Sequence, residues 1–229
     1  MPKLCWGIIK NMAYPNFNEE KRLWNRDFKC VVGLDEAGRG PLAGPVVAAA
    51  VVLKFKNLDL IKNLKFKIKS FSEIKDSKQL PEKKRQELYE KIINSADIEW
   101  GIGVVSEKII DKINILEATK LAMLKALRQA QGKLKNKIDF LILDGNFKID
   151  SDVPQKSIIK GDQKVFSISA ASIIAKVTRD RIMYKYDKKY PSYGFKKHKG
   201  YPTKAHFANL EKFGPCEIHR ESFWPVSKF

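Results

Sequence analysis

Residues 31–41 read Val-Val-Gly-Leu-Asp-Glu-Ala-Gly-Arg-Gly-Pro, and this stretch decides how the rest of the chain is interpreted. A short apolar segment runs directly into two adjacent carboxylates, Asp35 and Glu36, and then into Arg39, which has a glycine on each side. The apolar run predicts a buried strand over residues 30–34. Two acids at the end of a strand, followed by a basic residue on glycine-rich backbone, indicate a place where a metal ion and a phosphate meet.

Further strands and helices follow this one in a mixed order. Alternating or continuous apolar runs predict strands over residues 45–53, 97–105, 138–143 and 157–160. Helical periodicity predicts helices over about 81–95, 106–131, 169–186 and 203–213, the last one closed by Gly214. The apolar face of the second helix includes Leu116, Leu121, Leu124 and Leu127. This order predicts an α/β protein in which helices cover a mixed sheet.

Two segments have no clear periodicity. Residues 1–29 mix aromatic and charged side chains, and we expect them to pack on the main domain with a helical turn around residues 18–27. Residues 54–72 are rich in lysine, and we expect an exposed insertion or an irregular hairpin there.

The chain is strongly basic. Its 229 residues carry 44 Lys and Arg against 26 Asp and Glu, a formal net charge of +18. A solvated basic surface is one interpretation, and a binding surface for a polyanion such as nucleic acid is the other.

Cysteine usage and hydropathy set the expected compartment. The three cysteines, Cys5, Cys30 and Cys216, form no CxxC pair and no zinc-binding spacing, which favours a reduced intracellular protein. No apolar run approaches the ~20 residues that a membrane-spanning helix needs. No signal-peptide pattern follows the short apolar patch at the start. We therefore expect a cytoplasmic protein.

Two more acids stand out by position. Asp144 ends the predicted strand over 138–143, and Asp180 lies in the predicted helix over 169–186. Ile173, Val177, Asp180 and Tyr184 share one helical face, which we expect to pack on the sheet. A buried carboxylate there is costly unless a cation neutralises it.

Each acid also has an ordinary explanation. Asp180 could form an ion pair with Lys176, Arg179 or Arg181, and Asp144-Gly145 could be a simple turn after a strand. Acids at the carboxyl ends of neighbouring strands nevertheless converge in sheets of this kind. With no competing His or Cys cluster, an all-oxygen ligand set favours Mg²⁺ or Mn²⁺. Because consecutive strand residues point to opposite faces, we rank Asp35 above Glu36 as a direct ligand, and one of them could use its backbone carbonyl.

Ordered motifs across about residues 30–226 resemble ribonuclease HII, an RNase H-like family. The motifs are Gly33–Ala49, Asp76-Ser-Lys, Ile113-Asn-Ile, Leu143-Asp-Gly-Asn, Lys160-Gly-Asp, Ala170–Arg181, His198-Lys-Gly-Tyr-Pro-Thr, Gly214-Pro and His219-Arg-Glu-Ser-Phe. The tail is similar to the bacterial branch, and the short amino-terminal extension argues against the ribonuclease HIII branch. The resemblance implies an RNase H-like fold with a five-stranded mixed sheet and a helical C-terminal segment.

The resemblance also implies an activity and a set of residues. It implies endonucleolytic cleavage of RNA in RNA–DNA hybrids and incision 5′ of ribonucleotides embedded in DNA, leaving 3′-hydroxyl and 5′-phosphate ends. It implies two divalent ions held by Asp35, Glu36, Asp144 and Asp180. The residues that it implies for substrate binding are Gly38, Arg39 and Gly40 at the ribose 2′-hydroxyl, Ser77 and Lys78 at backbone phosphate, Lys160, and Tyr201 on the neighbouring deoxyribose.

The same resemblance divides the chain into three parts. These are an extension over residues 1–29, a catalytic domain over 30–190, and a C-terminal substrate-binding segment over 191–229. We expect a monomer with no obligate protein partner. The three histidines, His198, His206 and His219, have no ligand spacing, so we expect phosphate contacts or structural roles for them.

Two alternatives differ in class from this reading. One is a DNA nuclease or strand transferase with the same fold, against which the Gly38-Arg39-Gly40 segment argues. The other is a non-catalytic basic RNA-binding protein, against which the core-facing register of Asp180 argues.

Overall fold

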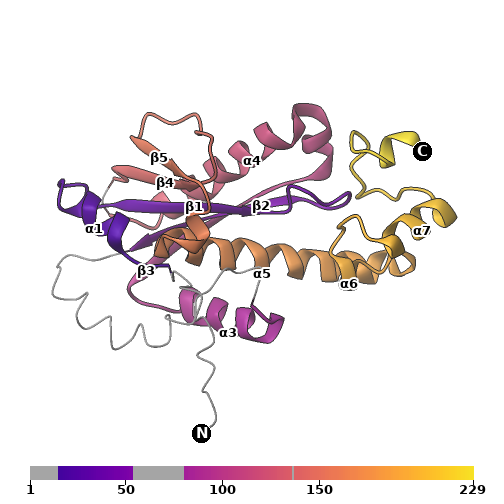
Figure 1. Ribbon diagram of the computed structural model, residues 1–229, viewed down its shortest axis with the longest axis horizontal. Helices are drawn as coiled ribbons and strands as arrows, with labels where there is room; N and C mark the ends of the chain where they lie inside the picture. Colours follow the sequence, from indigo (N-terminus) through magenta and orange to yellow (C-terminus); the bar gives the residue numbers. More distant parts are fainter. Residues whose placement is uncertain (1–14, 54–79, 136) are drawn as a thin grey trace, which may run out of the picture.

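The computed structural model describes residues 15–53, 80–135 and 137–229, and its centre is one five-stranded sheet (Figure 1). The strand order is β3-β2-β1-β4-β5. The strands are β1 (Val31–Ala37), β2 (Val46–Leu53), β3 (Ile98–Val105), β4 (Phe140–Asp144) and β5 (Gln155–Ile158). β1, β2 and β3 are antiparallel neighbours, whereas β4 runs parallel to β1 and to β5. The predicted five-stranded mixed sheet is therefore confirmed.

Helices cover both faces of this sheet, which explains why the central strands are apolar on both sides. The helices are α1 (Asn18–Trp24), α3 (Glu82–Ile93), α4 (Glu107–Gln131), α5 (Phe166–Lys189), α6 (Phe195–His198) and α7 (Lys204–Phe213), with short 3₁₀ turns at Gly161–Gln163, Pro191–Tyr193 and Val226–Lys228. Val46, Ala48, Ala50 and Val52 of β2 pack on the α4 side, whereas Ala49, Val51 and Leu53 pack on the side of α3 and α5.

The contact between α4 and the sheet differs from the prediction. The leucines expected to form the apolar face include Leu116, Leu121 and Leu124, which are only half-buried. The buried face consists mainly of alanines, Ala118, Ala122, Ala126 and Ala130, together with Met123 and the predicted Leu127.

Two glycines in β3 explain this shift of the buried face. A Cβ on Gly101 would lie 2.2 Å from the carbonyl oxygen of Ala126, and a Cβ on Gly103 would lie 1.9 Å from that of Ala122. The helix backbone therefore lies directly on the strand, and only small side chains fit between them.

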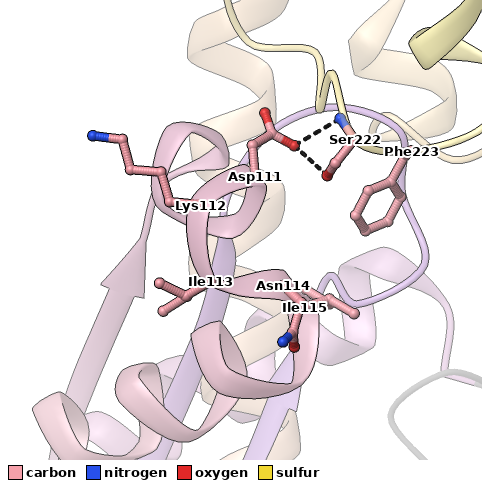
Figure 2. A pocket seen from close by; sticks show the side chains of 7 residues that line it. All are labelled: Asp111, Lys112, Ile113, Asn114, Ile115, Ser222 and Phe223. Atoms are coloured by element: carbon pink, nitrogen blue, oxygen red, sulfur yellow. Dashed lines mark hydrogen bonds between the residues drawn. The ribbon is translucent and has the colours of Figure 1, made fainter.

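The C-terminal segment packs at one end of the sheet, beside the connection between β1 and β2 (Figure 1). The backbone N–H of Leu42 donates to the carbonyl of Gly200 at 2.8 Å, and that of Gly44 donates to Ile218 at 2.8 Å. A second attachment lies at a kink in α4, where Asn114 has a positive φ of 65°. There Asp111 accepts hydrogen bonds from the backbone N–H and the hydroxyl of Ser222 (Figure 2). It also accepts from the backbone N–H of Glu221.

Most predicted element positions agree with the structure to within a few residues. α1 lies inside the expected helical turn of the extension, and β5 starts two residues earlier than expected. α5 is longer than predicted at both ends, and β1 continues past residue 34 to Ala37. The predicted lysine-rich insertion over 54–72 lies outside the described residues. Over the described ranges, the structure contains no helix that is both long and apolar enough to cross a membrane.

Candidate active site at the carboxyl ends of β1 and β4

Asp35 and Asp144 lie side by side because their strands are parallel neighbours. Leu34 of β1 pairs with Leu143 of β4, so the next residue of each strand is one of these acids. Asp35 is 3% exposed. Burial, and then the nearby charges of Glu36 and Asp144, raise the pKa of Asp35 well above its usual range. Mutual repulsion of buried carboxylates is the electrostatic state that a bound cation relieves.

Both acids are held in place by hydrogen bonds. Asp35 accepts from the backbone N–H of Glu36 at 2.7 Å and is hydrogen-bonded to Ser172 of α5. Asp144 accepts from the backbone N–H of Gly161 at 2.6 Å. Lys160 directly precedes that glycine in a left-handed conformation with φ of 56°, and its side chain is exposed. The structure thus places Lys160 next to Asp144, although 16 residues separate them in the chain.

Glu36 lies on the opposite side of β1 from Asp35, since the strand continues through both residues. Its carboxylate is 3.5 Å from the guanidinium of Arg39. The Arg39 guanidinium lies over the ring of Phe147 at 5.6 Å, just beyond the end of β4. Glu36 and Arg39 therefore both stay at the same strand ends as the aspartates.

Asp180 is held by cations. Lys176 donates to one of its carboxylate oxygens at 2.7 Å, and Arg85 of α3 lies 3.7 Å from the other. The part of α5 that carries Asp180 and Tyr184 contacts α3, where the Tyr184 hydroxyl hydrogen-bonds to Glu82. The prediction had placed this part of the helical face on the sheet. Of the three ion-pair partners considered for Asp180, only Lys176 is confirmed, since Arg181 pairs with Glu90. Among the residues that the structure describes, no three His, Cys, Asp or Glu side chains are close enough together to hold one ion.

Gly38 and Gly40 have different surroundings. Gly38 has φ of +101°, and a Cβ there would lie 2.2 Å from the buried side chain of Arg179. Gly40 has no such constraint among the described residues, where a Cβ would meet only the ring of Tyr201, at 3.9 Å. The turn explains Gly38, whereas at Gly40 the missing side chain leaves open, exposed space.

Tyr201 lies beside this open space. It follows α6 in the loop before α7, is 39% exposed, and lies within 5.8 Å of both the Lys176 ammonium and the Arg179 guanidinium. Tyr201 is thus brought next to Gly40 and α5 from a part of the chain about 160 residues away from Gly40.

Comparison with known proteins agrees with this geometry. The sequence model of the family "Ribonuclease HII" matches residues 32–226. The chain is 50% identical to ribonuclease HII of Acetivibrio thermocellus over 89% of this chain and 73% of that one. It is 47% identical to that of Chlamydia caviae, over 90% of each.

This chain belongs to the ribonuclease HII family. It is therefore a type 2 ribonuclease H, a hydrolase that cleaves RNA in RNA–DNA hybrids.

Solved structures share the same RNase H-like fold. The ribonuclease H2 of Pyrococcus horikoshii matches with a TM-score of 0.66 at 29% identity, over 87% of this chain and 96% of that one. Bst-RNase HIII, solved in complex with Mn²⁺, matches with a TM-score of 0.59 at 18% identity, over 88% of this chain and 69% of that one.

Two arginines that hold the connection between β1 and β2 in this ribonuclease HII family member were not predicted from the sequence. Arg179 and Arg220 are fully buried, and their guanidinium groups donate to carbonyl oxygens of residues 38–45. Its place in the sequence indicated Arg179 only as a possible ion-pair partner of Asp180. A basic residue on a helical face that is otherwise buried was the available signal.

Two of the three histidines have structural contacts in the core of the C-terminal segment. His206 and His219 are buried, and their Nε2 atoms lie 3.0 Å apart. His219 Nδ1 accepts from the backbone N–H of Cys216, so its Nε2–H donates to His206, whose Nδ1–H donates to the carbonyl of Tyr201. This series of hydrogen bonds requires both imidazole rings to be neutral, and burial lowers the pKa of each to about 4. The two histidines thus hold the backbone carbonyl of Tyr201 in place.

Ser77 and Lys78 lie outside the described residues, so their phosphate contacts stay predictions.

Proposed function

We propose that Asp35, Glu36, Asp144 and Asp180 hold two divalent ions, and that the enzyme incises 5′ of a ribonucleotide in duplex DNA. The observation that carries this proposal is the buried carboxylate of Asp35 at the end of β1, which the charges of Glu36 and of Asp144 at the end of β4 repel. Gly40 follows Asp35 by five residues, and Tyr201 lies against it. A phosphodiester and the ribose next to it would then be read from the same edge of the sheet.

The donor chemistry fits Mg²⁺ or Mn²⁺. All four candidate ligands are carboxylates, and the nearby hydrogen bonds from Ser172 and Gly161 would orient two of them. Bound ions of this kind activate water and stabilise the leaving oxygen in phosphodiester hydrolysis. The Lys176 ammonium neutralises Asp180 at 2.7 Å. Because it lies beside this candidate ligand, it would also contact a bound phosphate.

Substrate selection would rest on the residues that surround the open space. The exposed backbone at Gly40 lets a sugar edge approach, and a 2′-hydroxyl both donates and accepts hydrogen bonds. Arg39, Lys160 and, outside the described residues, Ser77 and Lys78 would contact phosphate. Tyr201 would pack on the deoxyribose of the neighbouring nucleotide, which makes residues 191–229 a substrate-binding segment attached to the catalytic domain over 30–190.

The assay uses a DNA duplex with a single ribonucleotide, incubated with Mg²⁺ or with Mn²⁺, beside an all-DNA duplex of the same sequence. We expect one cut on the 5′ side of the ribonucleotide, leaving 3′-hydroxyl and 5′-phosphate ends, and no cut in the all-DNA duplex. Equal cleavage of the two duplexes would contradict the proposal and favour a DNA nuclease of the same fold.

We further propose that the enzyme works as a cytoplasmic monomer without an obligate protein partner. Full activity of the purified chain at a molar mass of one copy in solution would support this. A requirement for dimer formation would contradict it.

A further inference from the structure

Arg179 and Arg220 together bind the backbone that carries Gly38, Arg39 and Gly40. Both side chains are 0% exposed. Arg220 donates to the carbonyls of Gly38 at 2.6 Å, Arg39 at 3.0 Å and Gly44 at 2.8 and 3.0 Å. Arg179 donates to those of Ala43, Pro45 and Lys199 at 2.9–3.0 Å.

These two charges are compensated in an unusual way. Within the described part of the chain, neither guanidinium forms an ion pair at salt-bridge distance, and carbonyl dipoles surround both. Burial lowers the pKa of Arg220 to about 9 and that of Arg179 to about 10, and each still carries its charge at neutral pH. Burying two cations is costly, so the benefit must lie in what they hold.

The consequence of these bonds is a fixed orientation of two peptide groups. In a trans peptide the C=O and the following N–H point in opposite directions. The carbonyls of Gly38 and Arg39 point inward to Arg220, so the N–H groups of Arg39 and Gly40 point outward. That outward side is the open space at Gly40, beside Tyr201.

We propose that Arg220, supported by Arg179, is a positioning residue that turns the backbone N–H groups of Arg39 and Gly40 toward the ribose and its phosphate. This proposal rests on the proposed function, in which that backbone reads the ribonucleotide. Only arginine has a planar fork of five N–H donors that can hold several carbonyls at once, and a lysine would lose most of these bonds.

The same contact makes ribose recognition depend on the C-terminal segment. Arg220 is 182 residues from Gly38 in the chain. Asp111, near the kink of α4, holds the two residues directly after Arg220. Its carboxylate accepts from the backbone N–H and the hydroxyl of Ser222 (Figure 2), and from the backbone N–H of Glu221. The position of Arg220 is therefore set by α4 and not by its own segment alone.

The test compares Arg220→Lys with the unaltered enzyme on the single-ribonucleotide duplex and on the all-DNA duplex. We expect kcat/KM on the ribonucleotide to fall about a hundred-fold, the scale of a small misplacement of a reacting group, with duplex binding nearly unchanged. In Arg220→Ala, added guanidinium at non-denaturing concentration should restore part of the lost rate. Arg128→Lys, an exposed arginine at the end of α4, is the matched control with unchanged activity.

A second variant separates the loss of cleavage in Arg220→Lys from a mere loss of protein stability. Met123→Ala removes a fully buried side chain from the core beneath α4 and should lower the unfolding temperature without lowering activity at 25 °C. If Arg220→Lys does not fold, Asp111→Asn carries the test, because it loosens the Arg220 segment and keeps the guanidinium. We expect this variant to lose ribonucleotide cleavage more than duplex binding.

Near-normal cleavage by folded Arg220→Lys, or by Asp111→Asn in its place, would overturn the positioning role. Absence of guanidinium rescue in folded Arg220→Ala would also overturn it. Failure of the unaltered enzyme to prefer the ribonucleotide would instead contradict the proposed function, so the two failures are distinguishable.

Discussion

At the scale of single residues, Gly38 and Gly40 should respond differently to the same substitution. Gly38→Ala places a Cβ against Arg179 at positive φ, so we expect lower stability by roughly 1–3 kcal/mol. Gly40→Ala adds a methyl group in exposed, open space, so stability should change by less than about 0.5 kcal/mol. Cleavage of the ribonucleotide should nevertheless fall strongly, because the methyl group would occupy the path of the sugar. Denaturant unfolding and the incision assay measure the two effects, and full activity of Gly40→Ala would contradict the assignment.

Asp35 gives a second test at this scale. Asp35→Asn keeps the size of the side chain and removes a buried negative charge that burial, Glu36 and Asp144 all disfavour. We expect the folded protein to be at least as stable, substrate to bind, and cleavage to fall to background. A near-normal rate would show that Asp35 is not a metal ligand. Asp139→Asn is a useful comparison, because Asp139 only accepts hydrogen bonds from the backbone of Lys29 and Cys30, outside the site.

At the scale of elements, α1 is joined to the start of α5 by a buried carboxylate. Glu20 is 0% exposed and accepts from the backbone N–H and the hydroxyl of Ser167 at 2.9 and 2.8 Å. Burial outweighs these bonds and raises the pKa of Glu20 from 4.5 to about 7. The described part of the amino-terminal extension thus caps the helix that carries Asp180.

This cap predicts a pH dependence of stability. A carboxyl whose pKa is higher in the folded state stabilises fully below pH 4.5, and its contribution is lost as the pH rises through about 7. Glu20→Gln should therefore match the unaltered protein near pH 4.5 and exceed its unfolding free energy at pH 8, by on the order of 3 kcal/mol. Denaturant unfolding at both pH values is the measurement.

The neighbouring Glu19 supplies a control of opposite sign. Burial raises the pKa of Glu19, but hydrogen bonds from Lys156 and Arg22 outweigh it and hold this pKa below its ordinary value. Glu19 therefore contributes to stability above its pKa in the unfolded state, and this contribution is lost as the pH falls. Glu19→Gln should thus lose a little stability at pH 8, and a pH-independent effect of Glu20→Gln would contradict the buried-cap explanation.

At the scale of the whole molecule, the net charge of +18 should govern affinity for the nucleic acid. Lysine and arginine contacts to phosphate release counterions, so binding weakens with salt. If about six phosphates are neutralised, duplex affinity should fall about a thousand-fold between 50 and 200 mM salt. Fluorescence anisotropy with the ribonucleotide duplex and the all-DNA duplex should give the same slope, because the charge term does not depend on the ribose. A flat salt response would mean that the basic surface faces away from the substrate.

The secondary-structure elements and the candidate carboxylates could be predicted from local sequence patterns. The five strands, the main helices and the acids at the ends of β1 and β4 could be predicted because each depends on neighbouring residues or on a strong local period. The glycine-flanked Arg39 and the cap of α7 at Thr203 and Gly214 are local in the same sense. The resemblance to ribonuclease HII was carried by such local motifs in order along the chain.

How these pieces meet depends on tertiary contacts. The alanine face of α4 follows from the approach of Gly101 and Gly103 on another element. Lys176 was one of the predicted partners of Asp180, but the second partner, Arg85, lies on a different helix about 95 residues away in the chain. Arg220 could not be foreseen, because its carbonyl partners lie far from it in the chain and leave no pattern in its own neighbourhood. The physical reason is the same in each case: backbone approach and buried charge are properties of contacts between distant segments, which no local period records.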